Sequence, residues 1–235
     1  MKPVAIIPAR GGSKRIPGKN IKPFGGVPMI AHPIATALES GLFSRIIVSS
    51  EDEEISSIAR RFGAETPFVR PPELASDHAP TAPVLAHALR WLENDTGLPG
   101  QCCLMYPATP FLTPETLLQG REILSSSGAA TAFAAAEHPA PIFRALQVDG
   151  NGFAKMIWPE HMHTRSQDLP RTVYDAGQFY WCDVRAFLAE GELYARRMVP
   201  VMLSRLQAID IDTPEDWELA EALFLAMEKQ GGKSR

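Results

Sequence analysis

The sequence predicts an α/β fold built on a mainly parallel sheet that helices cover on both faces. Short apolar runs alternate along the chain with segments whose apolar residues recur at helical spacing, which is typical of successive strand–helix–strand units. The chain has 235 residues, of which 45% are hydrophobic, and a chain of this length buries roughly 70% of its unfolded surface. We expect a single domain over residues 1–235, with an inserted lobe at about residues 138–172.

Apolar runs bounded by turn residues are interpreted as buried strands. In chain order they cover residues 4–7, 46–48, 102–106, 129–135 and 175–181. The stretch from 138 to 172 separates the last two runs, is rich in proline and lacks helical spacing. We therefore expect its strands and loops to leave the main sheet.

Helices are expected between these strands and after the last one, beginning near residues 28, 51, 84, 113 and 213. Pro28 suits the first position of the first helix, and Gly41 is well placed as its C-cap. Thr113 is placed to cap the fourth helix, and Thr213 with Asp216 can form a capping box for the last. The inward face of the last helix is expected to comprise Trp217, Ala220, Leu223, Phe224 and Met227.

Charge and composition narrow the class of partner. The formal net charge is −4, which gives no general attraction to nucleic acid or to an anionic membrane. No stretch approaches the roughly 20 apolar residues of a membrane span, and the first strand begins too early to leave room for a signal peptide. The three cysteines, Cys102, Cys103 and Cys182, are interpreted as reduced thiols of a cytoplasmic protein.

The most informative segment is a glycine-rich basic loop that follows the first strand directly. It runs from Arg10 to Asn20 and carries four basic side chains beside Gly11 and Gly12. The two glycines allow the backbone to approach a ligand closely, and such a loop can turn several N–H groups inward to bind an anion. Ligands of parallel sheets bind outside the carboxyl ends of the strands. The loop therefore predicts a polyphosphate site at this edge of the sheet.

Three alternative interpretations of this loop are less favoured. A Walker A loop requires glycine where Ser13 stands and Ser or Thr where Asn20 stands. A dinucleotide fingerprint requires Gly-x-Gly-x-x-Gly opening a helix, whereas Pro17 interrupts the run here. A solvated basic loop without a ligand is the third alternative, and surface charge runs rarely lie between an apolar strand and paired glycines.

A pair of carboxylates, Asp210 and Asp212, lies near the end of the chain. Alternate residues of a strand point to the same face, so both side chains would face one site. Two like charges so close raise each other's pKa unless a cation lies between them. Mg²⁺ typically takes one or two carboxylates together with substrate phosphates and waters. We expect the pair to bind Mg²⁺; the alternative, a single helix-capping aspartate, is weakened because Thr213 holds the capping position.

Over nearly its whole length the chain resembles the acylneuraminate (CMP-nonulosonate) cytidylyltransferase family. The resemblance is carried by residues 9–20, 46–50, 70–77, 107–110 and 210–213. Residues 164–170 and 175–181 look most like the pseudaminic acid branch of that family. The resemblance implies a Rossmann-like nucleotidyltransferase domain with a smaller dimerisation lobe, a homodimer, and Mg²⁺ as cofactor. The implied reaction transfers a cytidylyl group from CTP to the anomeric hydroxyl of an acidic nine-carbon sugar and releases pyrophosphate.

Roles carry over from the family where its motifs match this sequence. The nucleotide-binding set is Ala9, Arg10, Gly11, Gly12, Ser13, Lys14, Lys19, Asn20 and Thr81. The catalytic set is Arg10, Lys19, Asp210 and Asp212, of which the two aspartates hold the metal. The sugar-binding set is Tyr106, Arg165, Gln178 and Tyr180, with Arg165 pairing the sugar carboxylate. Because the nucleophile would be the sugar's own hydroxyl, the protein would contribute positioning and electrostatics.

Tyr106 is the clearest departure from the family pattern, because sialic acid synthetases usually have glutamine at this position. A larger and less polar side chain favours a less hydroxylated, deoxy nonulosonate over N-acetylneuraminate, and the resemblance to the pseudaminic acid branch favours pseudaminic acid. The same chemistry on N-acetylneuraminate, legionaminate or an octulosonate is the first alternative. A CTP-binding regulatory protein without turnover is the second, and it leaves the paired aspartates without a purpose.

Overall fold

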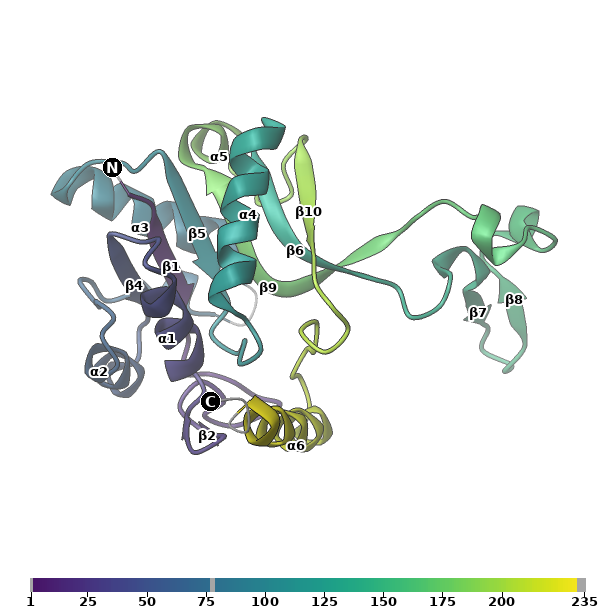
Figure 1. Cartoon of the computed structure of the whole chain (residues 1–235), viewed down its shortest axis with the longest axis horizontal. Helices are drawn as coiled ribbons and strands as arrows, with labels where there is room; N and C mark the ends of the chain where they lie inside the picture. Colours follow the sequence, from purple (N-terminus) through teal and green to yellow (C-terminus); the bar gives the residue numbers. More distant parts are fainter. Residues whose placement is uncertain (1, 77–78, 232–235) are drawn as a thin grey trace.

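A computed structural model describes residues 2–76 and 79–231. Its centre is a six-stranded sheet (Figure 1) with the strand order β10-β6-β9-β5-β1-β4. In this order the strands are Met198–Met202, Thr131–Glu137, Val173–Asp183, Gln101–Met105, Val4–Pro8 and Arg45–Ser49. β9 pairs antiparallel with both β5 and β6, and the other pairings in this sheet are parallel. The predicted, mainly parallel sheet is confirmed.

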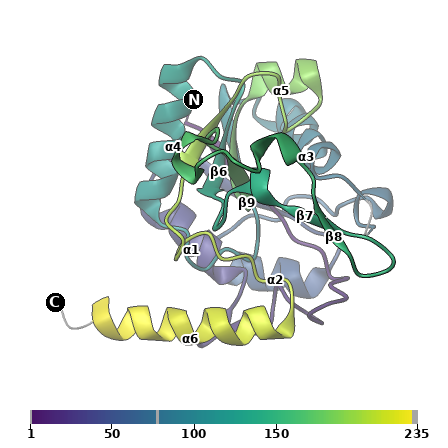
Figure 2. The same cartoon turned by 90° about the vertical axis from the view of Figure 1, so that its right-hand side faces the viewer.

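Helices cover both faces of the sheet, which was also predicted. They are α1 (Ala31–Ser40), α2 (Glu53–Arg61), α3 (Thr81–Asp95), α4 (Pro114–Ser127), α5 (Val184–Glu190) and α6 (Pro214–Gly231). Ile34, Ile55 and Leu117 bring α1, α2 and α4 into one buried apolar layer. Leu89 and Phe187 bring α3 and α5 into the layer on the opposite face. Figure 2 shows α1 and α4 on one side of the sheet and α3 and α5 on the other.

The last helix, α6, packs on the loops at the carboxyl end of β1 and not on the main sheet (Figure 2). Ile16 of the basic loop, Phe111 and Trp217 of α6 belong to one buried apolar cluster. The predicted capping box opens the helix: Thr213 N–H donates to Asp216 Oδ2 at 2.8 Å, and Asp216 N–H donates to Thr213 Oγ1 at 3.1 Å. The cap fixes where α6 begins and therefore where the preceding aspartates lie.

The prediction for the start of the first helix is wrong. Pro28 lies in β3 (Val27–Pro28), which pairs with β2 (Pro23–Phe24), and α1 begins only at Ala31. The intervening Gly25 and Gly26 have φ of 57° and 92°, as a tight hairpin turn requires. Gly25 and Gly26 form the turn of this hairpin, so Pro28 lies in its second strand and not in the helix.

Other elements also differ from the prediction. Met227 is exposed, because the C-terminal part of α6 extends beyond the body of the domain (Figure 2). The segment over residues 70–77, which carries part of the family resemblance, contains a short 3-10 turn at Pro72–Leu74, and its last residue, Asp77, lies outside the described residues. α5 and β10 have no counterpart among the predicted elements. None of the helices in the described part of the chain combines the length and apolar character needed to span a bilayer.

Residues 138–172 form a lobe that stands away from the main body (Figure 1). The lobe contains a two-stranded sheet of its own, β7 (Leu146–Val148) and β8 (Ala154–Met156), and three short 3-10 turns. It is connected by the outer ends of β6 and β9, which remain paired as far as Glu137 and Val173. Several of its apolar side chains are exposed: Leu146, Val148, Phe153, Ile157 and Met162.

Gly120 of α4 is a test of core packing. A Cβ at this position would lie 2.7 Å from the Trp181 ring and 2.9 Å from the Phe179 ring. Alanine normally improves a helix by about 1 kcal/mol over glycine, but overpacking a core costs about 1–3 kcal/mol. We expect Gly120→Ala to lower the free energy of unfolding by up to about 2 kcal/mol, measured by urea denaturation. Gly100→Ala, whose Cβ would meet nothing within 4 Å, is the control and should be nearly neutral.

Candidate active site

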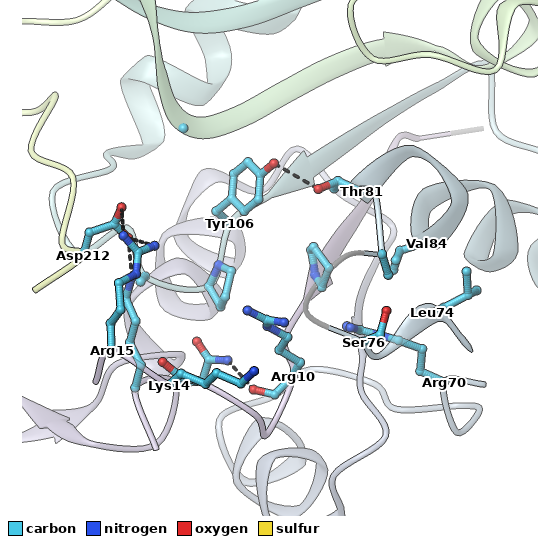
Figure 3. Close-up of a pocket in the computed structure, with 18 of the residues that line it drawn as sticks. Arg10, Lys14, Arg15, Arg70, Leu74, Ser76, Thr81, Val84, Tyr106 and Asp212 are labelled. Carbon is cyan, nitrogen blue, oxygen red and sulfur yellow. Dashed lines mark hydrogen bonds and ion pairs between the residues drawn. The ribbon is translucent and has the colours of Figure 1, made fainter. Parts of the chain in front are cut away.

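A cavity of about 670 Å³ opens at the carboxyl ends of β1 and β5 (Figure 3). The basic loop forms one wall, and the segments after β5 and β10 form part of the rest. Another wall is formed by Arg70, Leu74, Ser76, Ala79, Thr81 and Val84. Nine of the residues predicted from the sequence line it: Arg10, Ser13, Lys14, Lys19, Asn20, Thr81, Tyr106, Asp210 and Asp212. The cavity therefore brings together residues from both ends of the chain.

The basic loop keeps its shape through its own hydrogen bonds. Asn20 is 7% exposed, and its Nδ2 donates to the carbonyl oxygen of Arg10 at 2.9 Å. Lys19 N–H donates to Ile16 O at 3.1 Å, and Ile16 is buried against α6. Asn20 thus closes the loop from within, while the charged side chains of Arg10 and Lys19 line the cavity.

Asp210 and Asp212 do not lie on a strand, which corrects the prediction. They lie in the irregular segment between β10 and α6. Ile211 between them is 1% exposed and is anchored in the cluster beneath α6. Burying that one side chain leaves its two neighbours on the cavity side, so the expected common face is retained without strand structure.

The acidic pair meets the basic loop directly. Arg15 donates from Nη1 and Nη2 to the two oxygens of Asp212 at 2.8 and 2.9 Å, across 197 residues of sequence (Figure 3). Lys19 Nζ lies 3.6 Å from Asp212 Oδ1. Arg15 was not among the predicted site residues, because its sequence position does not distinguish it from the other loop cations.

The pKa of Asp210 lies above its ordinary value. Its side chain is exposed at the mouth of the cavity, yet surrounding protein removes part of the water from the carboxylate. That desolvation, followed by the negative charge of Asp212, raises the pKa, and Lys19 and Arg15 oppose the shift. A cation added beside Asp210 would favour its charged form and oppose this upward shift of the pKa.

The residues present fit a Mg²⁺ ion. Two carboxylates supply hard oxygen ligands on one side of the cavity, which is the number that protein Mg²⁺ sites with a bound phosphate commonly use. Within residues 2–76 and 79–231 no group of three or more His, Cys, Asp or Glu side chains is placed to hold a metal. The remaining ligands would therefore come from phosphate oxygens and water.

A buried arginine forms part of the cavity wall. Arg70 is 4% exposed, and its Nε donates to Ser49 Oγ at 3.2 Å while Nη2 donates to Ser49 O. Burial lowers the pKa of this guanidinium, with Glu51 acting in the opposite direction. Arg70 is not among the predicted site residues, because an arginine followed by two prolines gives no signal of burial in the sequence.

Tyr106 and Thr81 form a polar contact across the cavity. Their hydroxyl oxygens lie 3.1 Å apart (Figure 3), and burial raises the pKa of the Tyr106 phenol. The ring of Tyr106 packs edge-on against Tyr180, with 6.2 Å between the ring centroids. Tyr106 therefore connects the start of α3 to β9.

Several predicted residues lie outside the cavity lining. The Ala9 N–H pairs with Ser49 O at 3.0 Å, and the Gly11 N–H donates to Glu51 Oε1 at 2.8 Å. Arg165 lies in the lobe, exposed and paired with Asp168 at 2.7 Å. The other three are Gly12 in the loop, Gln178, whose amide donates to Gln207 O, and Tyr180, whose hydroxyl donates to Asp175.

Fold and cavity together define an α/β protein of the nucleotide-binding class, with a basic glycine loop and an acidic pair facing one cavity at the carboxyl edge of its sheet. The chain belongs to the cytidylyltransferase family, whose family model matches residues 4–230. The family resemblance seen in the sequence is thereby confirmed.

Curated relatives agree with this membership, and a solved structure shares the fold. A pseudaminic acid cytidylyltransferase of Campylobacter jejuni is 39% identical over 224 residues, covering 95% of this chain and 97% of that protein. A CMP-N,N'-diacetyllegionaminic acid synthase of Legionella pneumophila is 31% identical, with the same two coverages. The fold matches that of a CMP:2-keto-3-deoxy-manno-octonic acid synthetase complexed with CTP (TM-score 0.66, 20% identity, 97% of this chain and 100% of that one).

Proposed function

We propose that this protein transfers the cytidylyl group of CTP to the anomeric hydroxyl of pseudaminic acid and releases pyrophosphate. The observation that carries the proposal is the convergence of Lys19, Arg15 and Asp212 on one cavity in a member of the cytidylyltransferase family. Pseudaminic acid is favoured over other acidic sugars because the pseudaminic relatives reach 39% identity, whereas the legionaminate and N-acylneuraminate relatives reach 31% and 29%.

The loop side of the cavity is assigned to the nucleotide. Arg10, Ser13, Lys14 and Lys19 line this wall and would donate charge-assisted hydrogen bonds to the triphosphate, each worth about 1.5–3 kcal/mol. Their catalytic share is the part that strengthens as charge builds on the α-phosphate and the departing pyrophosphate. Asn20 holds the loop closed, and Thr81 would border the nucleoside.

The acidic side of the cavity is assigned to the cofactor. Asp210 and Asp212 would hold Mg²⁺, and the bound ion supplies charge neutralisation for phosphate oxygens. Arg15 and Lys19 compensate the negative charge of Asp212 from the basic loop. The same two cations are therefore placed to pair with phosphate oxygens in place of this carboxylate when CTP binds. Lys19 would then orient the α-phosphate for in-line attack by the sugar hydroxyl.

We further propose a homodimer, in which the lobe of each subunit packs on the other subunit. The lobe exposes Leu146, Val148, Phe153, Ile157 and Met162, and exposed apolar side chains of this number are common at interfaces. Arg165 belongs to the lobe, which stands away from the main body (Figure 1), and it does not line the cavity of its own chain. Its assigned contact with the sugar carboxylate would therefore be made across the interface.

The three buried, free cysteines suit a reducing compartment, and we propose the cytoplasm.

The proposal is tested by pyrophosphate release. With CTP and Mg²⁺, we expect pyrophosphate only when an acidic nine-carbon sugar is added, and a kcat/KM for pseudaminic acid at least about tenfold above that for N-acetylneuraminate, because Tyr106 disfavours the more hydroxylated sugar. Legionaminate and an octulosonate complete the panel. A preference for one of these acids would replace pseudaminic acid as the substrate. Binding of CTP without pyrophosphate release from any of them would favour the regulatory interpretation.

A further inference from the structure

A carboxylate, that of Glu51, is placed against the basic loop, where its charge alone would weaken the binding of an anion. Glu51 follows β4 directly and accepts the N–H of Gly11 through Oε1 at 2.8 Å. Gly11 lies 40 residues earlier in the chain, so the bond ties the loop to the start of α2. The negative charge of Glu51 opposes anion binding, and its hydrogen bond to the loop backbone gives it a geometric role that offsets this cost.

The second oxygen of the same carboxylate faces the buried arginine of the cavity wall. Glu51 Oε2 lies 3.8 Å from Arg70 Nη1. This oxygen is buried and accepts no hydrogen bond from the described residues, and the nearby guanidinium of Arg70 compensates its charge. One side chain therefore contacts both the basic loop and a second cationic wall of the cavity.

Gly11 is held from the other side as well. A Cβ on Gly11 would lie 2.3 Å from Asp52 Oδ2, and Asp52 cannot move away, because its Oδ1 caps α2 by accepting from Glu54 N and Ile55 N. The loop backbone therefore packs directly against the first turn of α2. The hydrogen bond from Gly11 to Glu51 fixes the position of the loop along that turn.

We propose that Glu51 is a positioning residue for nucleotide binding: through Gly11 and Arg70 it sets the distance between the basic loop and the opposite cationic wall. Glu51 itself does not contact the ligand. The inference rests on the proposed function, since it takes the cavity to hold the phosphates of CTP. It assigns Glu51 an effect on CTP affinity and not on the chemical step or on the sugar.

Two uncharged variants of similar length separate geometry from charge. Glu51→Gln keeps an oxygen that can accept the Gly11 N–H, whereas Glu51→Met has none. We expect Glu51→Met to raise the KM for CTP about tenfold, with kcat and the KM for the sugar within about twofold of wild type. Glu51→Gln should stay within about threefold of wild type in KM for CTP. Hydrogen exchange should become faster in peptides containing Gly11 for Glu51→Met alone.

Glu53→Met is the matched control, because Glu53 begins α2, pairs with Arg60 at 2.5 Å and is largely exposed. If Glu51→Met does not fold, Glu51→Ala takes its place in the same comparison. An unchanged KM for CTP in a folded Glu51→Met protein overturns the inference, as does an equal defect in Glu51→Gln. A wild-type protein that neither binds CTP nor releases pyrophosphate overturns the proposed function instead, so the two failures are distinguishable.

Discussion

Replacing Lys19 by alanine is expected to lower kcat by about 100- to 1,000-fold while the protein remains folded. Lys19 is mostly buried in the cavity wall, and its ammonium lies 3.6 Å from Asp212. Under the proposed function it donates to phosphate oxygens that gain charge in the transition state, and losing one such donor costs about 10²–10³ in rate. The measurement is single-turnover pyrophosphate release at saturating CTP and sugar.

Lys229→Ala provides the matched control, because Lys229 is exposed in the last turn of α6. It removes the same charge from a helix that contacts the basic loop but does not reach the cavity. Circular dichroism melting of both variants should resemble wild type. A folded Lys19→Ala protein with nearly normal turnover would show that the ammonium plays no part in the chemical step.

Replacing Asp210 by asparagine is expected to reduce turnover at least about a hundredfold without destabilising the fold. Under the proposed function Asp210 would be a carboxylate ligand of Mg²⁺, whose charge an amide cannot supply, and metal-derived charge stabilisation amounts to several kcal/mol. The stability change has the opposite sign. Desolvation and Asp212 raise the pKa of Asp210 in the folded state, so its charged form costs stability at neutral pH.

The pH dependence checks that sign. A carboxyl whose pKa is raised on folding binds its proton more tightly in the native state, so the wild type loses its deficit as the pH falls through the raised pKa toward 3.8. Without metal, Asp210→Asn should therefore melt slightly above wild type at pH 7, and the gap should close in acid. Asp95→Asn, at an exposed carboxylate that pairs with Arg45, serves as comparison and should melt no higher than wild type. An Asp210→Asn protein that melts well below wild type at pH 7 would contradict this account.

The order of strands and helices was predictable because periodicity and caps are local signals. Thr113 and the Thr213–Asp216 box mark helix starts through hydrogen bonds made within four residues. β9, the strand that follows the lobe, was also predicted, because its part within the main sheet is largely apolar. The hairpin at Gly25 and Gly26 was missed because Pro28 fits two structures equally well when its neighbours are unknown.

The candidate site was predictable in its chemistry but not in its contacts. A loop of cations and a pair of carboxylates imply a shared ligand, and the structure brings Arg15 within 2.8 Å of Asp212. Which cation makes that contact depends on tertiary placement, so Arg15 was not singled out. Arg70 and Glu51 were missed for the same reason: their roles come from packing between the end of β4 and the basic loop. Arg165 is the opposite case, because a sequence motif identifies it but its own chain gives it no place in the cavity. Under the proposed function, the sugar carboxylate that it contacts lies in the cavity of the other subunit.

The position of β9 has a consequence for synthesis on the ribosome. β9 joins the pair β10–β6 to the trio β5–β1–β4, yet it is translated only after the whole lobe. Until residue 183 has emerged, the outer edge of β5 and the inner edge of β6 lack their partner, and unpaired edges invite association with other chains. A nascent chain paused within the lobe would hold the trio β5–β1–β4 with one open edge and β6 without either of its neighbours, because β10 also follows the lobe, so we expect a chaperone to be needed while residues 137–173 emerge.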